Sequence, residues 1–334
     1  MQRPSDDAAM DAAVTFFLAG DDAALASWRG LQPDREPQRM VLGEDYWIVQ
    51  TWARLRDAGL PVALDNRVPD DGVAVFYAGD KRAVRKAFDA GSNALLVAVR
   101  SDRHPVGFAD VEIVQNASSA DGRRTMHVPH WPQPGLLPRD PARGDAVRTV
   151  LFPGTPQNLD AGFHSPGWKA FLAQRNLVFR THELDADSTA WNDYRGVDAL
   201  LAIRPQSMGF IRNKPGWKLF NAWLAGVPAI LGPEAGYREL RRGPLDFIEA
   251  ATPAAAMQAL QRLLDEPGLY RAMVANGSVR GRDYTVAETL RRWQRLLEQL
   301  ATRSADPARR PQSRFVRGCR EAWFRLRRPW KPYG

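Results

Sequence analysis

A cluster of positively charged side chains surrounds one short segment of the chain. Residues 214–221 read KPGWKLFN and place Lys214 and Lys218 at the start of an expected helix, with Asn221 roughly on the same face as Lys218. Arg204 ends the apolar run VDALLAIR, which is typical of a buried strand. Strand carboxyl ends and helix amino ends are places where α/β folds bind anions. Either lysine alone would be an ordinary solvated residue, but the cluster predicts a site for a negatively charged ligand.

Polar residues in two further segments could contact the same ligand. The apolar run AILGP leads to Glu234, with Glu239 shortly after it. An acid there can hydrogen-bond ribose hydroxyls, or it can simply favour the start of the next helix, and both interpretations stay open. The loop FPGTPQN contains Gly154, where backbone could approach a ligand, and the hydrogen-bonding side chains of Thr155 and Asn158. An ordinary loop between a strand and a helix is the alternative.

Length and composition indicate a globular protein of two domains. The 334 residues suffice for two cores, and 44% hydrophobic with 25% charged residues excludes a disordered chain. The single cysteine, Cys319, excludes an internal disulfide framework and is typical of a reducing compartment. The start, MQRPSDDAAMDAAV, lacks the features of a signal peptide, and no stretch approaches the ~20 apolar residues of a membrane span. We therefore expect a cytoplasmic protein.

The chain reads as two series of strands alternating with helices. Residues 1–126 begin with a weakly periodic stretch expected to be helical over its first 30 residues, followed by four expected strands. Residues 127–146 are rich in proline and read as a linker. The alternation restarts in residues 147–301, which end in three expected helices. Such alternation predicts an α/β fold of two domains with parallel, doubly wound sheets.

The positive charge is concentrated in residues 302–334. This tail holds ten Lys or Arg and two acids, so it carries the whole net charge of +8. The rest is neutral, which argues against a nucleic-acid partner. Within residues 314–331, an expected helix sets Phe315, Cys319 and Trp323 among arginines. This pattern predicts a basic amphipathic helix that contacts an anionic membrane surface. The alternative is that its aromatic face packs on the first domain.

Several segments together resemble a known family. KLFNAWLAGVPAILGPE, then DFIEA, LLDEPGLYRAMVANG and RDYTVAETLRRWQRLL, look like the donor-binding domain of family-four-like GT-B glycosyltransferases. HVPHWPQPGLLPRD and DYWIVQTWARLRDAG resemble stretches of bacterial members, so the resemblance covers about residues 40–300. It implies two Rossmann-like domains facing a cleft. It also implies transfer of a hexosyl or related group from a nucleotide-sugar donor, bound by the C-terminal domain, to a glycan or lipid-linked acceptor, bound by the N-terminal one. Cell-envelope polysaccharide or glycolipid synthesis, with peripheral contact to the membrane, would follow.

The sequence departs from the family pattern at two positions. The group often carries two glutamates eight residues apart, and here Asn213 and Asn221 occupy those positions. Neutral amides can hydrogen-bond a sugar or phosphate but cannot act as carboxylates, which leaves retention or inversion open. GT-B fucosyltransferases resemble the segment over a shorter stretch. In those enzymes the lysine follows a glutamate, whereas Lys218 follows Trp217.

Candidates for a base, a metal site and a cofactor are sparse. An inverting transfer would need a base near neutral pKa, and His130 in PHWPQPG is the candidate, although a histidine among Trp and Pro is often structural. No zinc spacing is visible, and no Asp-x-Asp follows an apolar strand. We expect no metal and no cofactor, with the basic cluster stabilising the leaving diphosphate.

Other classes of function remain as alternatives. A non-catalytic protein that binds sugar nucleotides would fit the loss of both glutamates. An NAD-dependent dehydrogenase is disfavoured, because neither first-strand loop carries G-x-G-x-x-G.

Overall fold

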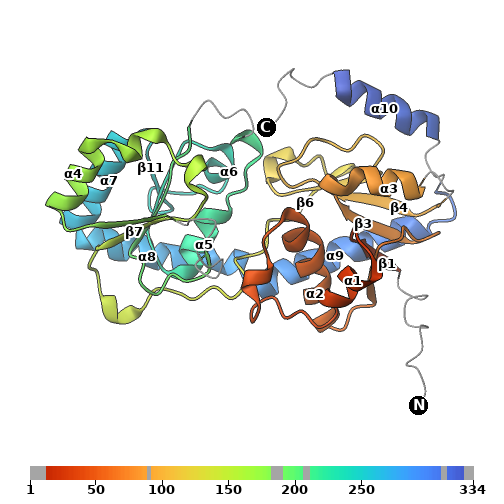
Figure 1. Ribbon diagram of the computed structural model, residues 1–334, viewed down its shortest axis with the longest axis horizontal. Coiled ribbons are helices and arrows are strands. Elements are labelled where there is room, and N and C mark those ends of the chain that lie inside the picture. The colour runs from red at the N-terminus through yellow and green to blue at the C-terminus, as the bar shows by residue number, and fades with distance from the viewer. Residues whose placement is uncertain (1–12, 89–91, 182–190, 206–210, 310–313, 327–334) are drawn as a thin grey trace, which may run out of the picture. The chain divides into compact units, whose positions relative to one another are not determined.

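The chain folds into two α/β units, each built around its own sheet (Figure 1). All of the strand pairs in both sheets are parallel. The computed structural model describes residues 13–88, 92–181, 191–205, 211–309 and 314–326. Unit 1 comprises residues 1–33, 40–128 and 290–334, and unit 2 comprises residues 34–39 and 129–289. The predicted α/β class with two parallel-sheet domains is confirmed.

Six strands form the sheet of unit 1 in the order β2-β1-β3-β4-β5-β6. The strands are β1 (Val14–Phe17), β2 (Val62–Asp65), β3 (Val73–Tyr77), β4 (Leu95–Val99), β5 (Val111–Val114) and β6 (Thr125–His127). The helices are α1 (Asp22–Trp28), α2 (Gln50–Asp57, after a π-helical turn at Asp45–Val49), α3 (Lys81–Phe88), most of α9 (Val286–Ala305) and α10 (Arg314–Leu326). The central runs VAVFY and LLVAV are buried along their whole length, as expected for a parallel sheet covered on both faces.

The first strand corrects one sequence-based expectation. Residues before 30 were expected to be helical, but Val14–Phe17 forms β1 between β2 and β3, and only α1 is helical there. Residues 1–12 lie outside the described part of the chain. The four residues VTFF are too few for periodicity to separate strand from helix. Their conformation depends on pairing with strands that come much later in the chain.

Five strands form the sheet of unit 2 in the order β11-β10-β9-β7-β8. They are β7 (Thr149–Phe152), β8 (Val178–Thr181), β9 (Ala199–Ala202), β10 (Ala229–Leu231) and β11 (Ile248–Glu249). The helices are α4 (Pro166–Gln174), α5 (Trp217–Ala225), α6 (Ala235–Arg238), α7 (Pro253–Asp265) and α8 (Pro267–Gly281). The chain steps from β7 outward to β8 and then back past β7 to β9, so the topological switch point lies between β7 and β9.

The division between the units differs from the predicted domain boundaries. The sequence places residues up to 301 in the second domain and a separate tail at 302–334, but residues from 290 onward belong to unit 1. In α9, Trp293 is fully buried and its ring lies 6.3 Å from that of Phe16 in β1. The apolar face of α9 therefore completes the core of unit 1 (Figure 1).

The expected proline-rich linker belongs largely to unit 2. The amide of Leu137 donates to the carbonyl of Asn192 at 2.8 Å, and the amide of Tyr194 donates back to Leu137 at 2.9 Å. Arg139 binds the buried carboxylate of Asp198 at 2.8 Å. Apart from a 3-10 turn at Pro141–Arg143, this segment without helical period is thus held by hydrogen bonds and an ion pair. By their apolar pattern, residues 177–183 are expected to form a strand and residues 186–196 a helix; both expectations fall partly on residues 182–190, outside the described ranges, and the described residues 191–196 form no α-helix.

Candidate functional site

The carboxyl ends of β7, β9 and β10 bring the predicted ligand-binding residues together. These strands are adjacent in the sheet, so the residues that follow them meet at one edge. Gly154 follows β7, Arg204 follows β9 and Glu234 follows β10. Lys218 reaches the same edge from the first turn of α5. The edge coincides with the switch point, where open α/β sheets bind their ligands.

Lys218 is a buried cation of the site. Its ammonium donates a hydrogen bond to the carbonyl of Pro153, directly after β7. The aromatic rings of Phe152, Trp191 and Trp217 surround the nitrogen at 5.9, 5.9 and 6.0 Å. Burial, reinforced by the charge of Arg204, holds the pKa of Lys218 well below its ordinary value. A lysine in this setting gains a counter-charge when an anion binds beside it.

Gly154 leaves space next to this lysine. A Cβ atom at Gly154 would lie 3.0 Å from the ring of Phe152 and 3.5 Å from the nitrogen of Lys218. Any side chain would therefore press on the aromatic wall and approach the ammonium group. This crowding agrees with a close approach of a ligand to the backbone of Gly154. That approach itself stays a prediction.

Arg204 and Glu234 form a buried ion pair, which sequence spacing did not reveal. The guanidinium of Arg204 donates to Oε2 of Glu234. The other carboxylate oxygen, Oε1, is buried and has no hydrogen-bond partner among the described residues. Burial raises the pKa of Glu234, although Arg204 and Lys218 oppose that shift. Oε1 is thus an available acceptor for a ligand hydroxyl, and Arg204 is not the isolated cation that the sequence predicted.

Asn221 and His130 lie beside the start of α5. The side-chain oxygen of Asn221 accepts a hydrogen bond from the amide of Gln133 at 3.0 Å. The Nδ1 atom of His130 lies 2.7 Å from the carbonyl oxygen of Trp131, and its ring is 4.8 Å from that of Trp217. A carbonyl can only accept, so Nδ1 is the donor in this contact. The predicted base therefore lies next to the basic cluster, with Nδ1 engaged by the backbone.

The remaining predicted residues contribute unequally. Lys214 follows a 3-10 turn at Ile211–Asn213, and its charge lowers the pKa of Lys218, so it belongs to the cluster. Thr155 and Asn158 bond each other, with 2.6 Å between Nδ2 and Oγ1. Glu239 comes after α6, so the idea that it favours the start of that helix is wrong. Residues 206–210, which lead from the end of β9 toward Lys214 and begin with Gln206 and Ser207, lie outside the described residues.

Two aromatic residues near the site were missed by sequence reasoning. Tyr237 is fully buried beside Arg204 and Glu234, and burial raises its pKa strongly. Trp191 forms one wall around Lys218. Neither residue carries a spacing signal, because aromatic residues at such positions look like ordinary core residues in a sequence.

Unit 1 contains a further unusual carboxylate, Asp80, at the end of a 3-10 turn that follows β3. Its Oδ2 atom is buried without a hydrogen-bond partner in the described part of the chain. Burial and the nearby charge of Glu44 raise its pKa to about 6, although Arg103 lowers it. The sequence showed only an acid before a helix, which is a common capping pattern.

We expect Asp80→Asn to stabilise the protein in a manner that depends on pH. The pKa of Asp80 is higher in the folded chain, about 6 against 3.8, so wild-type stability falls as pH rises between these values and Asp80 becomes charged. Because Asp80 is partly exposed to solvent, the free energy of unfolding of the variant should exceed that of the wild type by ~1 kcal/mol at pH 7 and by almost nothing at pH 4. Urea unfolding at both pH values measures this. An equal difference in unfolding free energy between variant and wild type at both pH values would contradict the assigned titration of Asp80.

Comparisons with known proteins identify the fold. No family model matches the chain, and no curated protein matches it. Among solved structures, sucrose-phosphate synthase from Thermosynechococcus elongatus superimposes with a TM-score of 0.55 at 12% identity, covering 86% of this chain and 99% of that one. HepE from Anabaena in complex with UDP gives a TM-score of 0.51 at 14% identity, covering 86% and 100%. The chain thus has the GT-B fold of these proteins, as the resemblance implied.

Two properties concern metals and membranes. In the ranges that the structure describes, no group of three or more His, Cys, Asp or Glu side chains is placed to hold a metal ion. Over the same ranges, no helix has the length and apolar character needed to cross a membrane. Independence from metal remains a prediction.

Proposed function

We propose that the protein is a glycosyltransferase that moves a hexosyl or related group from a nucleotide-sugar donor to an acceptor hydroxyl. The observation that carries the proposal is the cluster of Arg204, Lys214 and Lys218 at the switch point of unit 2 in a GT-B fold. Cations fixed where a leaving group becomes charged stabilise the transition state. HepE is named as binding UDP and UDP-glucose, which makes a uridine diphosphate sugar the first donor to test.

Four residues of the site have a defined task in this proposal. Lys218 and Lys214 neutralise the diphosphate as the bond from the anomeric carbon to its oxygen breaks. The uncommitted Oε1 of Glu234 accepts a hydrogen bond from a ribose hydroxyl. Nε2 of His130 takes the proton of the acceptor hydroxyl as the new carbon–oxygen bond forms. Burial of the cations strengthens these interactions, because the surroundings screen charge less than water does.

The acceptor and the cellular setting extend the same proposal. A glycan or lipid-linked acceptor, in cell-envelope polysaccharide or glycolipid synthesis, would require work at the cytoplasmic face of a membrane. We infer that residues 314–331 make peripheral contact with that surface. The support is the described helix α10, Arg314–Leu326, which exposes apolar side chains beside basic ones. We propose that no metal and no cofactor take part.

Binding of the donor can be tested by thermal unfolding. UDP and UDP-glucose at about 100 times their Kd should raise the melting temperature by roughly 5 °C, because a ligand that binds only the folded state stabilises it by mass action. Uridine, which lacks the phosphates, should give a much smaller shift. GDP-, ADP- and CMP-sugars serve as the comparison set. If none of these nucleotides shifts the transition, the site does not bind a sugar nucleotide.

Turnover separates the enzyme from the second candidate, a non-catalytic binding protein. That candidate is favoured by one observation, the amides Asn213 and Asn221 at positions where the family often has glutamates. Release of UDP from UDP-glucose, with and without acceptor extracts, distinguishes the two. A thermal shift without any release would support the binding protein.

A further inference from the structure

Helix α10 docks on unit 1 through its charged side. Arg317 is almost fully buried, and its guanidinium donates to Oδ2 of Asp110 at 3.0 Å and to the carbonyl of Phe108 at 2.7 Å. Glu321, one turn later, pairs with Arg85 of α3. Buried ion pairs with additional hydrogen bonds hold such a helix in one rotational setting.

The opposite side of α10 is apolar and exposed. Phe315 is 80% exposed, Leu326 85% and Trp323 47%. With 100° per residue, these three side chains fall within one arc of the helix, away from Arg317. Amphipathic helices normally bury such a face, so the orientation is the reverse of the common one. The alternative, in which the aromatic face packs on the first domain, is therefore wrong, although the helix itself does pack there.

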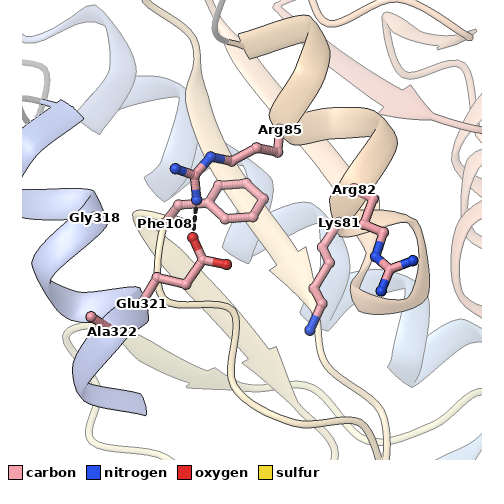
Figure 2. Close-up of a pocket in the computed structure, with 7 residues that line it drawn as sticks. All are labelled: Lys81, Arg82, Arg85, Phe108, Gly318, Glu321 and Ala322. Carbon is pink, nitrogen blue, oxygen red and sulfur yellow. Dashed lines mark hydrogen bonds and ion pairs between the residues drawn. The ribbon is translucent and has the colours of Figure 1, made fainter. Parts of the chain in front are cut away.

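A cavity of about 640 Å³ lies between α10 and α3 (Figure 2). Its lining residues are Lys81, Arg82, Arg85, Phe108, Gly318, Glu321 and Ala322. Three of them are cations and one is an acid, and Arg85 already pairs with that acid. Figure 2 shows Lys81 and Arg85 extending from α3 on the side that faces α10. The lining side chains together carry a net charge of +2, at a cavity large enough for a phosphate group with its substituents.

The cavity adjoins the apolar side of α10. Gly318 and Ala322 line it, and Leu326 lies one further turn along the same row of the helix. The two small residues leave the space open, and the exposed leucine continues the surface beyond it. A cationic hollow next to an exposed apolar strip matches a ligand that carries an anion and a hydrocarbon chain in one molecule.

We propose that this cavity binds the phosphate of an anionic membrane lipid, while the apolar side of α10 enters the acyl region. The inference deepens the proposed membrane contact and is independent of sugar transfer. A free phosphate compound shares the anionic chemistry, but it would not account for the exposed Phe315, Trp323 and Leu326. Headgroup contact by cations and burial of aromatic side chains together are what stable binding to an interface requires.

The test is co-sedimentation of the full chain with vesicles of phosphatidylcholine alone or with 30% phosphatidylglycerol. We expect binding to the anionic vesicles only. The double variant Lys81→Gln/Arg82→Gln should weaken it about 10-fold or more, because each basic residue near an anionic surface adds up to ~1 kcal/mol. Trp323→Ser/Leu326→Ser should weaken it at least as much. These residues are partly or largely exposed, so the fold should persist, which the melting temperature verifies.

A matched control removes the same charge elsewhere. Lys86→Gln/Lys169→Gln eliminates two exposed cations that do not line the cavity. This control should weaken vesicle binding less than 3-fold, which on a logarithmic scale is about half of the 10-fold effect expected for the cavity variant. Equal loss in the control and the cavity variant would overturn the headgroup site. The headgroup site would also be overturned if the chain bound inorganic phosphate at millimolar concentration but did not bind the anionic vesicles, because its ligand would then be a soluble compound. UDP binding should be intact in every variant, so failure here is distinguishable from failure of the proposed enzyme.

Discussion

Replacement of Lys218 by methionine is expected to abolish most sugar transfer and, at the same time, to raise the melting temperature. The ammonium is buried among three aromatic rings and contacts the backbone of Pro153. Loss of a charge-assisted contact to the leaving diphosphate typically costs ~2–4 kcal/mol, or about 10²–10³-fold in rate. A thioether of similar length fits an aromatic surrounding without the desolvation penalty, so stability should rise by ~1 kcal/mol.

The stability gain should depend on pH in a defined direction. The folded-state pKa of Lys218 lies well below 10.5. Below the folded pKa the wild-type lysine is charged in both states, and burying that charge costs free energy in full. Between the folded pKa and 10.5 the cost fades, because the folded lysine is neutral. The advantage of Lys218→Met should therefore be largest below the folded-state pKa and shrink as the pH rises above it.

Initial rates with UDP-glucose and melting curves measure both effects. Lys214→Met is the matched control, since Lys214 belongs to the same cluster but is only half-buried. It should reduce activity less than Lys218→Met and should not stabilise the fold. Full activity in Lys218→Met would remove Lys218 from the site. Unfolding of that variant would instead show that the lysine is needed for structure.

The pairing of Arg204 changes how that residue should be probed. In the structure, alanine at Arg204 would leave the buried carboxylate of Glu234 without its counter-ion. Breaking one partner of a buried pair typically costs ~3–5 kcal/mol. Lys218 is therefore the cleaner probe of ligand binding.

Local signals in the sequence predicted the elements of unit 2 well. Gly226 ends α5 with a φ of 72°, the left-handed conformation that favours glycine. The side chain of Thr252 caps α7, with 3.2 Å between Oγ1 and the amide of Ala255. Each signal depends on residues within a few positions of one another. The alternation of such elements was enough to indicate two parallel sheets.

Long-range relations could not be predicted in the same way. The partner of Arg204 is thirty residues away, and the partner of Arg317, Asp110, lies directly before β5, more than two hundred residues earlier. Both pairs depend on strand order, which hydrophobic patterns do not specify. The site was found because α/β topology places strand ends at one edge whatever the details. The charge pairing within it required the structure.

Asp198→Asn is expected to cause the largest loss of stability in unit 2. This carboxylate is fully buried and accepts hydrogen bonds from the guanidinium groups of Arg139 and Arg143 and from the amides of Arg148 and Thr149. The variant leaves buried guanidinium charge without its counter-ion, which typically costs ~3–5 kcal/mol. It also removes the carboxylate that holds Arg139 and the segment around it in unit 2.

Asp193→Asn provides the matched control. Asp193 pairs with Arg195 through two hydrogen bonds, but that arginine is 65% exposed at its side chain. Exposed ion pairs contribute ~1 kcal/mol or less, so this variant should unfold nearly as the wild type does. Urea unfolding followed by tryptophan fluorescence measures both. Similar small losses in the two variants would show that the arginines around Asp198 are held by other contacts.

The effect of Asp198 should also fade in acid. Burial alone would raise its pKa, but the hydrogen bonds from Arg143, Arg148, Thr149 and Arg139 outweigh it and lower the pKa below 3.8. Stability from this group is therefore complete above 3.8 and is lost as the pH falls through the folded-state value. The difference in free energy of unfolding between wild type and Asp198→Asn should be constant from pH 5 to 8 and should become smaller below pH 4. If this difference persisted at low pH, the packing of the side chain, rather than its charge, would account for its contribution to stability.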